Sequence, residues 1–85
     1  MRRNPYVILP VAFYEHHRDA GMPTPFNHAE EPGKVAVLAH DPATRSLYEN
    51  AKRHSERYAT LQIPYHLSRS ALATVRAIER VWNGG

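Results

Sequence analysis

Histidine and carboxylate side chains are the residues of this sequence that could bind a metal ion. The chain has six histidines and eight Asp or Glu residues, but no cysteine, which excludes thiolate zinc sites, iron–sulfur clusters and disulfides. His16 and His17 are adjacent, so on a helix their side chains diverge by about 100° and do not converge on one ion. Glu15 and Asp19, four residues apart, could bring two carboxylates onto one helix face. The other histidines follow no ligand spacing such as His-x-x-x-His; they are His28, His40, His54 and His66. We therefore expect no metal and no other cofactor.

Serine nucleophiles and paired carboxylates are the other routes to catalysis. The serines lie inside or at the start of predicted helices, without the strand–turn–helix elbow that exposes a nucleophile; they are Ser46, Ser55, Ser68 and Ser70. Glu30 and Glu31 are adjacent in a predicted loop, whereas carboxylate catalysis needs two groups held across a cleft. No glycine-rich loop is present to hold phosphates. We expect a protein that is not an enzyme.

Arginine dominates the basic residues, with nine Arg against two Lys, and the formal net charge is +3. One arginine-containing segment, His66-Leu67-Ser68-Arg69-Ser70-Ala71 and onward to Arg80, resembles the recognition helix of helix-turn-helix repressors. The resemblance implies that Ser68 caps the helix and that Ser68, Arg69 and Ser70 reach base edges and phosphates. It also implies that Arg76 and Arg80 lie along the DNA backbone. A small DNA-binding regulator is therefore one alternative for the function, and nucleic acid is a possible partner.

The C-terminal half carries the clearest secondary-structure signals. Asp41 is a good N-cap and Pro42 a good first helical residue, which starts a helix over about 42–62. Apolar residues then recur on one face: Leu47, Ala51, His54, Tyr58 and Leu61. A second stripe predicts a helix over about 65–83: Leu67, Ala71, Val75, Ile78 and Trp82. Two such helices joined by a tight turn are expected to pack as an antiparallel hairpin.

The N-terminal half is divided by prolines. Pro10 and Gly21 bound a short predicted helix over about 10–20, and residues 22–33 follow no periodic pattern. The apolar run at 34–39 fits a short strand or a helical turn, and both interpretations stay open. We therefore predict a mainly α protein in a single domain, with residues 1–40 as an extended proline-rich arm and residues 41–85 as the helical hairpin.

Large apolar side chains outnumber what so small a core needs, since 85 residues allow only one domain. We expect the surplus to bind a partner protein. The candidate protein-binding residues are Tyr6, Ile8, Phe13, Tyr14, Phe26, Tyr48, Tyr65 and Trp82. The leading hypothesis is a non-catalytic accessory or adaptor subunit that binds a larger protein complex, or a homo-oligomer. A small protein inhibitor of a partner enzyme is a third alternative.

The chain offers little evidence on its location. No apolar run approaches the ~20 residues that a membrane-spanning helix needs, so we expect no membrane span. The absence of cysteine favours a soluble protein of a reducing compartment over a secreted one. The compartment itself stays open.

Overall fold

The chain forms a three-stranded antiparallel sheet packed against three helices. The computed structural model describes residues 5–28, 31–61 and 65–84, and at 57–61 it describes the backbone only. The elements in chain order are β1 (Tyr6–Pro10), α1 (Val11–Asp19), β2 (Asn27–His28), β3 (Lys34–Leu38), α2 (Pro42–Leu61) and α3 (Tyr65–Trp82). The predicted fold class, mainly α with a C-terminal hairpin and an extended arm, is therefore wrong. The fold is α+β.

The sheet is what the sequence reasoning missed. Its strand order is β1-β3-β2, with Val7 opposite Val37 and Ile8 opposite Ala36 in the β1–β3 pair. The apolar run for which a strand and a helical turn were both open is thus the central strand. The amide of Val11 donates to Gly33 O at 3.0 Å, so the odd-numbered residues of β1 bond to β3. The backbone of Pro10, which has no N–H, points away from β3 at this edge strand, so the sheet loses no hydrogen bond.

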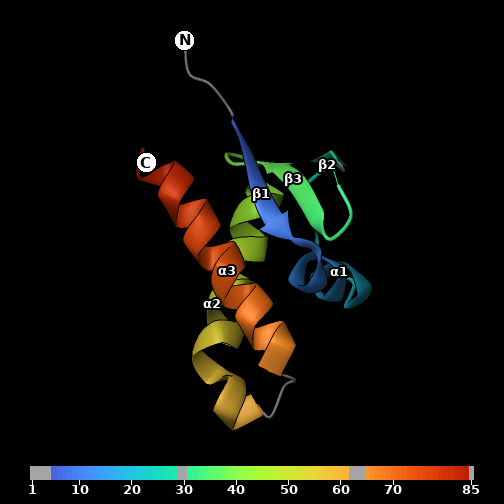
Figure 1. The fold of residues 1–85 in the computed structure, drawn as a ribbon, viewed down its shortest axis with the longest axis vertical. Helices are drawn as coiled ribbons and strands as arrows, with labels where there is room; N and C mark the ends of the chain where they lie inside the picture. The colour runs from blue at the N-terminus through green and yellow to red at the C-terminus, as the bar shows by residue number, and fades with distance from the viewer. Residues whose placement is uncertain (1–4, 29–30, 62–64, 85) are drawn as a thin grey trace.

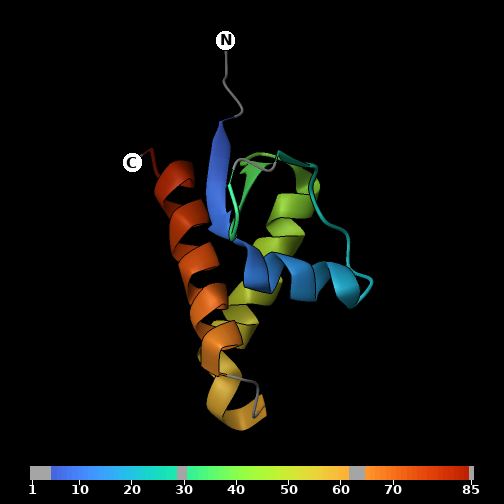
Figure 2. The ribbon, with the colours of Figure 1, turned by 45° about the vertical axis from the view of Figure 1, so that its right-hand side comes forward.

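Residues 6–19 form β1 and α1, both of which contribute side chains to the core, and do not form an arm. Val7 and Leu9 of β1 and Phe13 and Tyr14 of α1 are all buried. Helix α3 packs against α2, β1 and α1 and runs alongside β1 in both views (Figures 1 and 2). A two-helix hairpin alone would leave the inner face of α3 half-covered, and the sheet and α1 complete its burial. The helices contribute Leu47, Ala51, Leu67, Ala71, Val75 and Ile78 to the same core.

Three hydrogen bonds join separate elements of the fold, and two of them, across 57 and 43 residues, are long-range. The amide of Phe13 donates to Ser70 Oγ at 2.9 Å, across 57 residues of sequence. Thr44 Oγ1 donates to Leu38 O at 2.6 Å. The indole of Trp82 donates to Ala39 O at 2.7 Å. The bonds from Thr44 and Trp82 tie α2 and α3 to the end of β3, and the bond from Phe13 ties α1 to α3.

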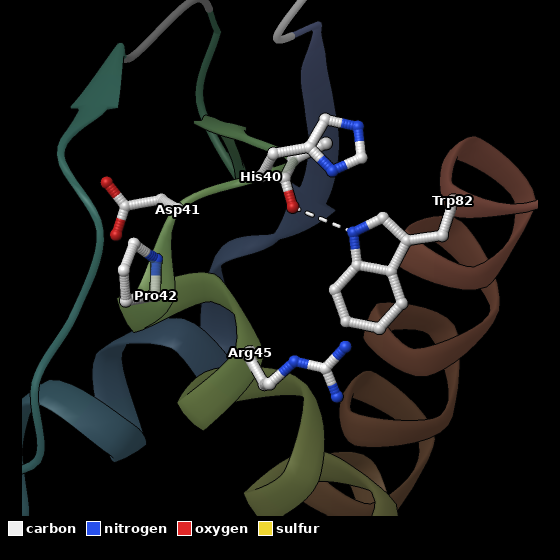
Figure 3. Close-up of a pocket in the computed structure, with 6 residues that line it drawn as sticks. His40, Asp41, Pro42, Arg45 and Trp82 are labelled. Atoms are coloured by element: carbon white, nitrogen blue, oxygen red, sulfur yellow. Dashed lines mark hydrogen bonds between the residues drawn. The ribbon is translucent and has the colours of Figure 1, made fainter.

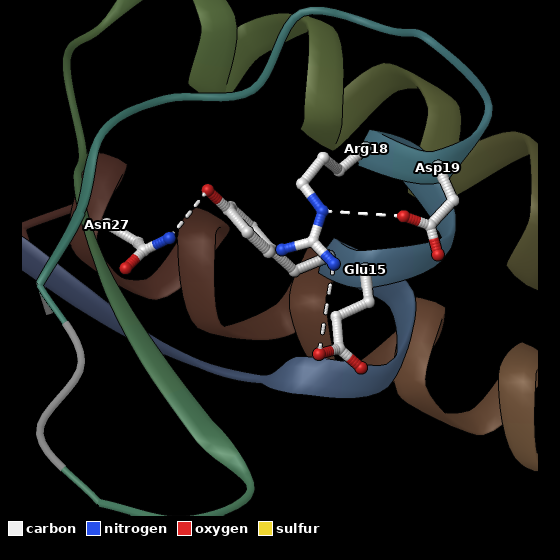
Figure 4. Close-up of polar contacts among 5 residues, drawn as sticks. Glu15, Arg18, Asp19 and Asn27 are labelled. Carbon is white, nitrogen blue, oxygen red and sulfur yellow. Dashed lines mark hydrogen bonds and ion pairs between the residues drawn. The ribbon is translucent and has the colours of Figure 1, made fainter.

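The segment after α1 is held by two side chains of that helix. Tyr14 Oη donates to Pro25 O at 2.9 Å and accepts from Asn27 Nδ2 at 3.0 Å, the latter contact being drawn in Figure 4. His17 Nε2 lies 2.9 Å from Pro23 O. Residues 22–28 show no periodic sequence pattern and are ordered by hydrogen bonds from side chains of α1. These bonds position β2 beside β3.

Candidate functional site

The side of the sheet that faces away from the helices is the first candidate surface. Along β1 the side chains alternate: Val7 and Leu9 point into the core, whereas Tyr6 and Ile8 are 49% and 47% exposed. A sheet with one face packed on a core normally places polar residues on its other face. Here that face carries an aromatic and an aliphatic side chain.

The strand register adds further residues to this face. Tyr6 pairs with Leu38, while Ile8 and His28 flank Ala36 on either side. By the same alternation Phe26, the residue directly before β2, falls on the side of His28 and Tyr6; it is 71% exposed. The rings of Tyr6 and His28 lie 6.0 Å apart between centroids. We name this surface the outer sheet face; its exposed members are Tyr6, Ile8, Phe26 and His28, while Leu38 is half-buried and Ala36 is fully buried.

The other predicted protein-binding residues lie elsewhere. Phe13 and Tyr14 are buried in the core and are not available to a partner in this structure. Tyr65, at the start of α3, is exposed and lies near the Arg69 guanidinium, 5.8 Å from ring centroid to Cζ. Tyr48 and Trp82 pack together on the edge of the core, 4.7 Å apart between ring centroids.

Trp82 forms one wall of an open pocket of about 410 Å³ between the end of α3 and the start of α2 (Figure 3). The Arg45 guanidinium lies 5.1 Å from the centre of the Trp82 ring, within cation–π distance. Asp41 Oδ1 accepts the amide of Ala43 at 2.8 Å and so caps α2. The polar groups that line this pocket are therefore largely engaged in holding the helix ends, and we give the pocket a structural role.

Tyr48 and Glu79 form a tight hydrogen bond beside that pocket. Tyr48 Oη donates to Glu79 Oε2 at 2.6 Å. The bond to this carboxylate raises the pKa of the Tyr48 phenol above its usual range, and desolvation adds to the effect. The bond also ties the Glu79 carboxylate of α3 to α2.

The predicted nucleic-acid-binding residues are divided between the core and the surface. Ser68 and Ser70 are buried, and Ser70 Oγ accepts the amide of Phe13. Arg69, Arg76 and Arg80 are exposed and line a groove of about 320 Å³. The rest of the groove is formed by Leu72, Ala73 and Ala77. We name this surface the α3 groove.

Within the described part of the chain, no group of three or more His, Asp or Glu side chains is arranged to hold a metal ion. The two carboxylates that shared a predicted helix face, Glu15 and Asp19, both contact Arg18, at 4.0 Å and 3.4 Å (Figure 4). His17 is fully buried between Pro23 and Asn50. Across the same residues, no helix is both long and apolar enough to span a membrane.

Leu38 and His28 were not predicted as members of the outer sheet face. No local signal marks them, because they join Tyr6 and Ile8 only through the pairing of strands that are about 30 residues apart in sequence. Leu72 was interpreted as widening the core stripe of this helix, and Ala73 and Ala77 were given no role.

Comparison of the chain with protein-family models, with curated proteins and with solved structures gives no match. The function is therefore argued from the surfaces described above.

Proposed function

We propose that this chain is a non-catalytic accessory or adaptor protein that binds a partner protein through its outer sheet face. The observation that supports this most is the gathering of Tyr6, Ile8, Phe26 and Leu38 on one side of the sheet, from three separate segments. The partner that fits is a protein with an apolar patch of its own, since the face presents few groups for hydrogen bonding apart from the tips of Tyr6 and His28.

The alternative is that these exposed apolar residues have no binding role. Tyr and Ile are good strand formers, and single exposed apolar residues are common on protein surfaces. That interpretation explains Tyr6 and Ile8 separately. It does not explain why a third large apolar side chain, Phe26, directly before β2 and 71% exposed, adds to these two. An exposed phenylalanine beside two other apolar side chains is typical of an interaction site.

The DNA-binding alternative has less support. Ser68 and Ser70, which the resemblance places at base edges, are both buried, and Ser70 Oγ accepts the amide of Phe13 from α1. The inhibitor alternative would use the same outer sheet face, so it differs from the proposal only in what the partner does.

Photo-crosslinking tests the proposal directly. A benzoylphenylalanine is placed at position 8, at position 26 or, as a control, at the exposed position 52 of α2, in cells that make the protein at its native level. We expect positions 8 and 26 to give one shared adduct with a different protein, and position 52 to give none. The double variant Tyr6→Thr, Ile8→Thr should abolish the adduct at position 26, because threonine keeps the strand propensity while removing most of the apolar surface.

Two results would refute the proposal. Adducts of the same pattern at all three positions would mean that contact at the outer sheet face is random. Adducts only with a second copy of this chain would replace the adaptor with a homo-oligomer. Urea unfolding of the double variant separates lost binding from lost folding. Its free energy of unfolding is expected within about 0.5 kcal/mol of the wild type, because the changes are on the surface.

A further inference from the structure

The α3 groove is built from two rows of side chains along one helix. Arg69, Ala73 and Ala77 form one row at intervals of four residues; Leu72, Arg76 and Arg80 form the next. Rows at this spacing are the ridges between which a second helix packs in globular proteins. The small side chains of Ala73 and Ala77 lower the middle of the surface, and Leu72, 38% exposed, gives it an apolar edge.

No described carboxylate forms an ion pair with the cations of the groove. Among the described residues, the ion pairs are those that Arg18 makes with Glu15 and Asp19, on a different helix. The carboxylate on α3, that of Glu79, accepts a hydrogen bond from the Tyr48 hydroxyl of α2. Among the described residues, Arg69 contacts the ring of Tyr65, and a contact with a ring face leaves the guanidinium N–H donors open to an anion.

The spacing of the arginines indicates the shape of the anionic partner. Arg69 and Arg80 are separated by 11 residues, or about 16 Å along the helix axis, and Arg76 is one turn from Arg80. Between them lie apolar side chains. A ligand that satisfies both features needs carboxylates near its two ends and an apolar surface at its middle, as an amphipathic helix of three to four turns provides.

We infer that the α3 groove binds an acidic amphipathic helix of a partner protein. Arginine is suited to this, because its planar guanidinium binds a carboxylate through two parallel hydrogen bonds. A nucleic acid would meet the cations but would gain nothing from Leu72, Ala73 and Ala77. A duplex is also held by about six to ten phosphate contacts in strongly salt-dependent complexes, more than three arginines provide. The inference goes beyond the proposed function, since it concerns a different face.

Selection from a displayed library of helical peptides tests the inference without knowledge of the natural partner. The full chain is the target, and the double variant Arg76→Gln, Arg80→Gln serves for counter-selection. We expect the enriched peptides to carry Glu or Asp at both ends and Leu, Ile or Ala between them. Their affinity, measured by fluorescence anisotropy, should fall at least about tenfold for the double variant, because charge-assisted hydrogen bonds are lost.

Two further variants separate a groove from a merely basic surface. Ala73→Leu keeps the charge and the helix propensity but fills the groove, so it should weaken the peptides several-fold. Lys52→Gln removes one exposed cation on α2 and should leave the affinity within about twofold, as a surface change away from the site. Urea unfolding of each variant checks that the fold is kept.

The outcomes that overturn the inference are equally definite. A selection that yields no binders dependent on Arg76 and Arg80 would refute it. Binders unaffected by Ala73→Leu would show charge attraction without a groove. A 20-base-pair duplex that competes for the groove more strongly than the best peptide would assign it to nucleic acid. None of these results bears on crosslinking from positions 8 and 26, so the two proposals can fail separately.

Discussion

The buried histidine of α1 gives the most exact prediction from this structure. His17 is fully buried, with Nε2 2.9 Å from Pro23 O and Nδ1 2.9 Å from Asn50 Nδ2. A carbonyl oxygen can only accept, so Nε2 carries the hydrogen and Nδ1 accepts from the amide. The imidazole is therefore neutral, and a proton on Nδ1 would meet the N–H donor of Asn50.

Burial lowers the pKa of His17 below its ordinary value of 6.5. The hydrogen bond to Pro23 O opposes this shift, whereas the nearby charges of His16, His54 and Arg53 add to it. Because the unfolded chain keeps a pKa near 6.5, it binds more protons than the folded chain below that pH. The free energy of unfolding should therefore fall as the pH drops through about 6.5, by at most about 1.4 kcal/mol per pH unit from this residue, until the folded pKa is passed.

Replacing Asn50 with Asp should reverse this dependence. The new carboxylate accepts a hydrogen bond from the protonated Nδ1, and its charge favours the imidazolium, so the pKa of His17 should rise. A raised pKa contributes stability that is present below pH 6.5 and lost as the pH rises through the folded value. The side chain keeps its size, so the packing around it should change little.

Urea unfolding at pH 7.5, 6.5 and 5.5, together with the NMR titration of the His17 ring, measures both effects. The difference between Asn50→Asp and the wild type cancels the contribution of the other histidines. His28→Gln, on the outer sheet face, is the control and should keep the wild-type slope. Equal slopes for the wild type and Asn50→Asp, or an NMR pKa of His17 above 6.5 in the wild type, would refute the hydrogen-bond assignment.

Two further predictions concern stability. Ser70→Ala removes the acceptor of the buried Phe13 amide and should lower the free energy of unfolding by about 1–3 kcal/mol, whereas Ser46→Ala on α2 should change it by less than about 0.5 kcal/mol; equal effects in urea unfolding would deny that α1 is fixed through Ser70. Gly33→Ala should lower the free energy of unfolding by about 1–2 kcal/mol in the same assay, because the residue has φ +82° and alanine is strained there. A Cβ at this position would meet nothing within 4 Å, so backbone strain is the only expected cause. A neutral result would mean that the turn before β3 can adopt another conformation.

Local chemistry was enough to predict where α2 begins. Asp41 and Pro42 act through groups that lie within three residues, and the carboxylate of Asp41 does accept the amide of Ala43. The strand at Tyr6–Pro10 could not be recognised in the same way, because its hydrogen-bonding partner lies 24–32 residues further on and no turn signal connects the two. An apolar segment between two prolines therefore resembled an arm, and the fold class was wrong.

The candidate sites were predicted unevenly for a related reason. Phe13 and Tyr14 were grouped with Tyr6 and Ile8 by residue type, although their helical position beside His17 is that of a buried face. Ser68 and Ser70 matched a motif by their order in the chain. Both are buried, and Ser70 contacts α1 through the amide of Phe13. No pattern within α3 reveals that α1 packs there.

The outer sheet face differs from the core in what the fold requires of it. Val7 and Leu9 must be apolar, because they complete a core shared by all three helices. Tyr6 and Ile8 occupy the alternate positions, where Thr or Lys would preserve the strand and its pairing equally well. Folding therefore does not account for the apolar residues at these positions, or for Phe26 and Leu38 beside them. The α3 groove shows the same independence, since neither its arginines nor Leu72 contributes to the buried core. Residues that the fold does not need, gathered on two faces of so small a protein, are the physical reason to look for a partner at each.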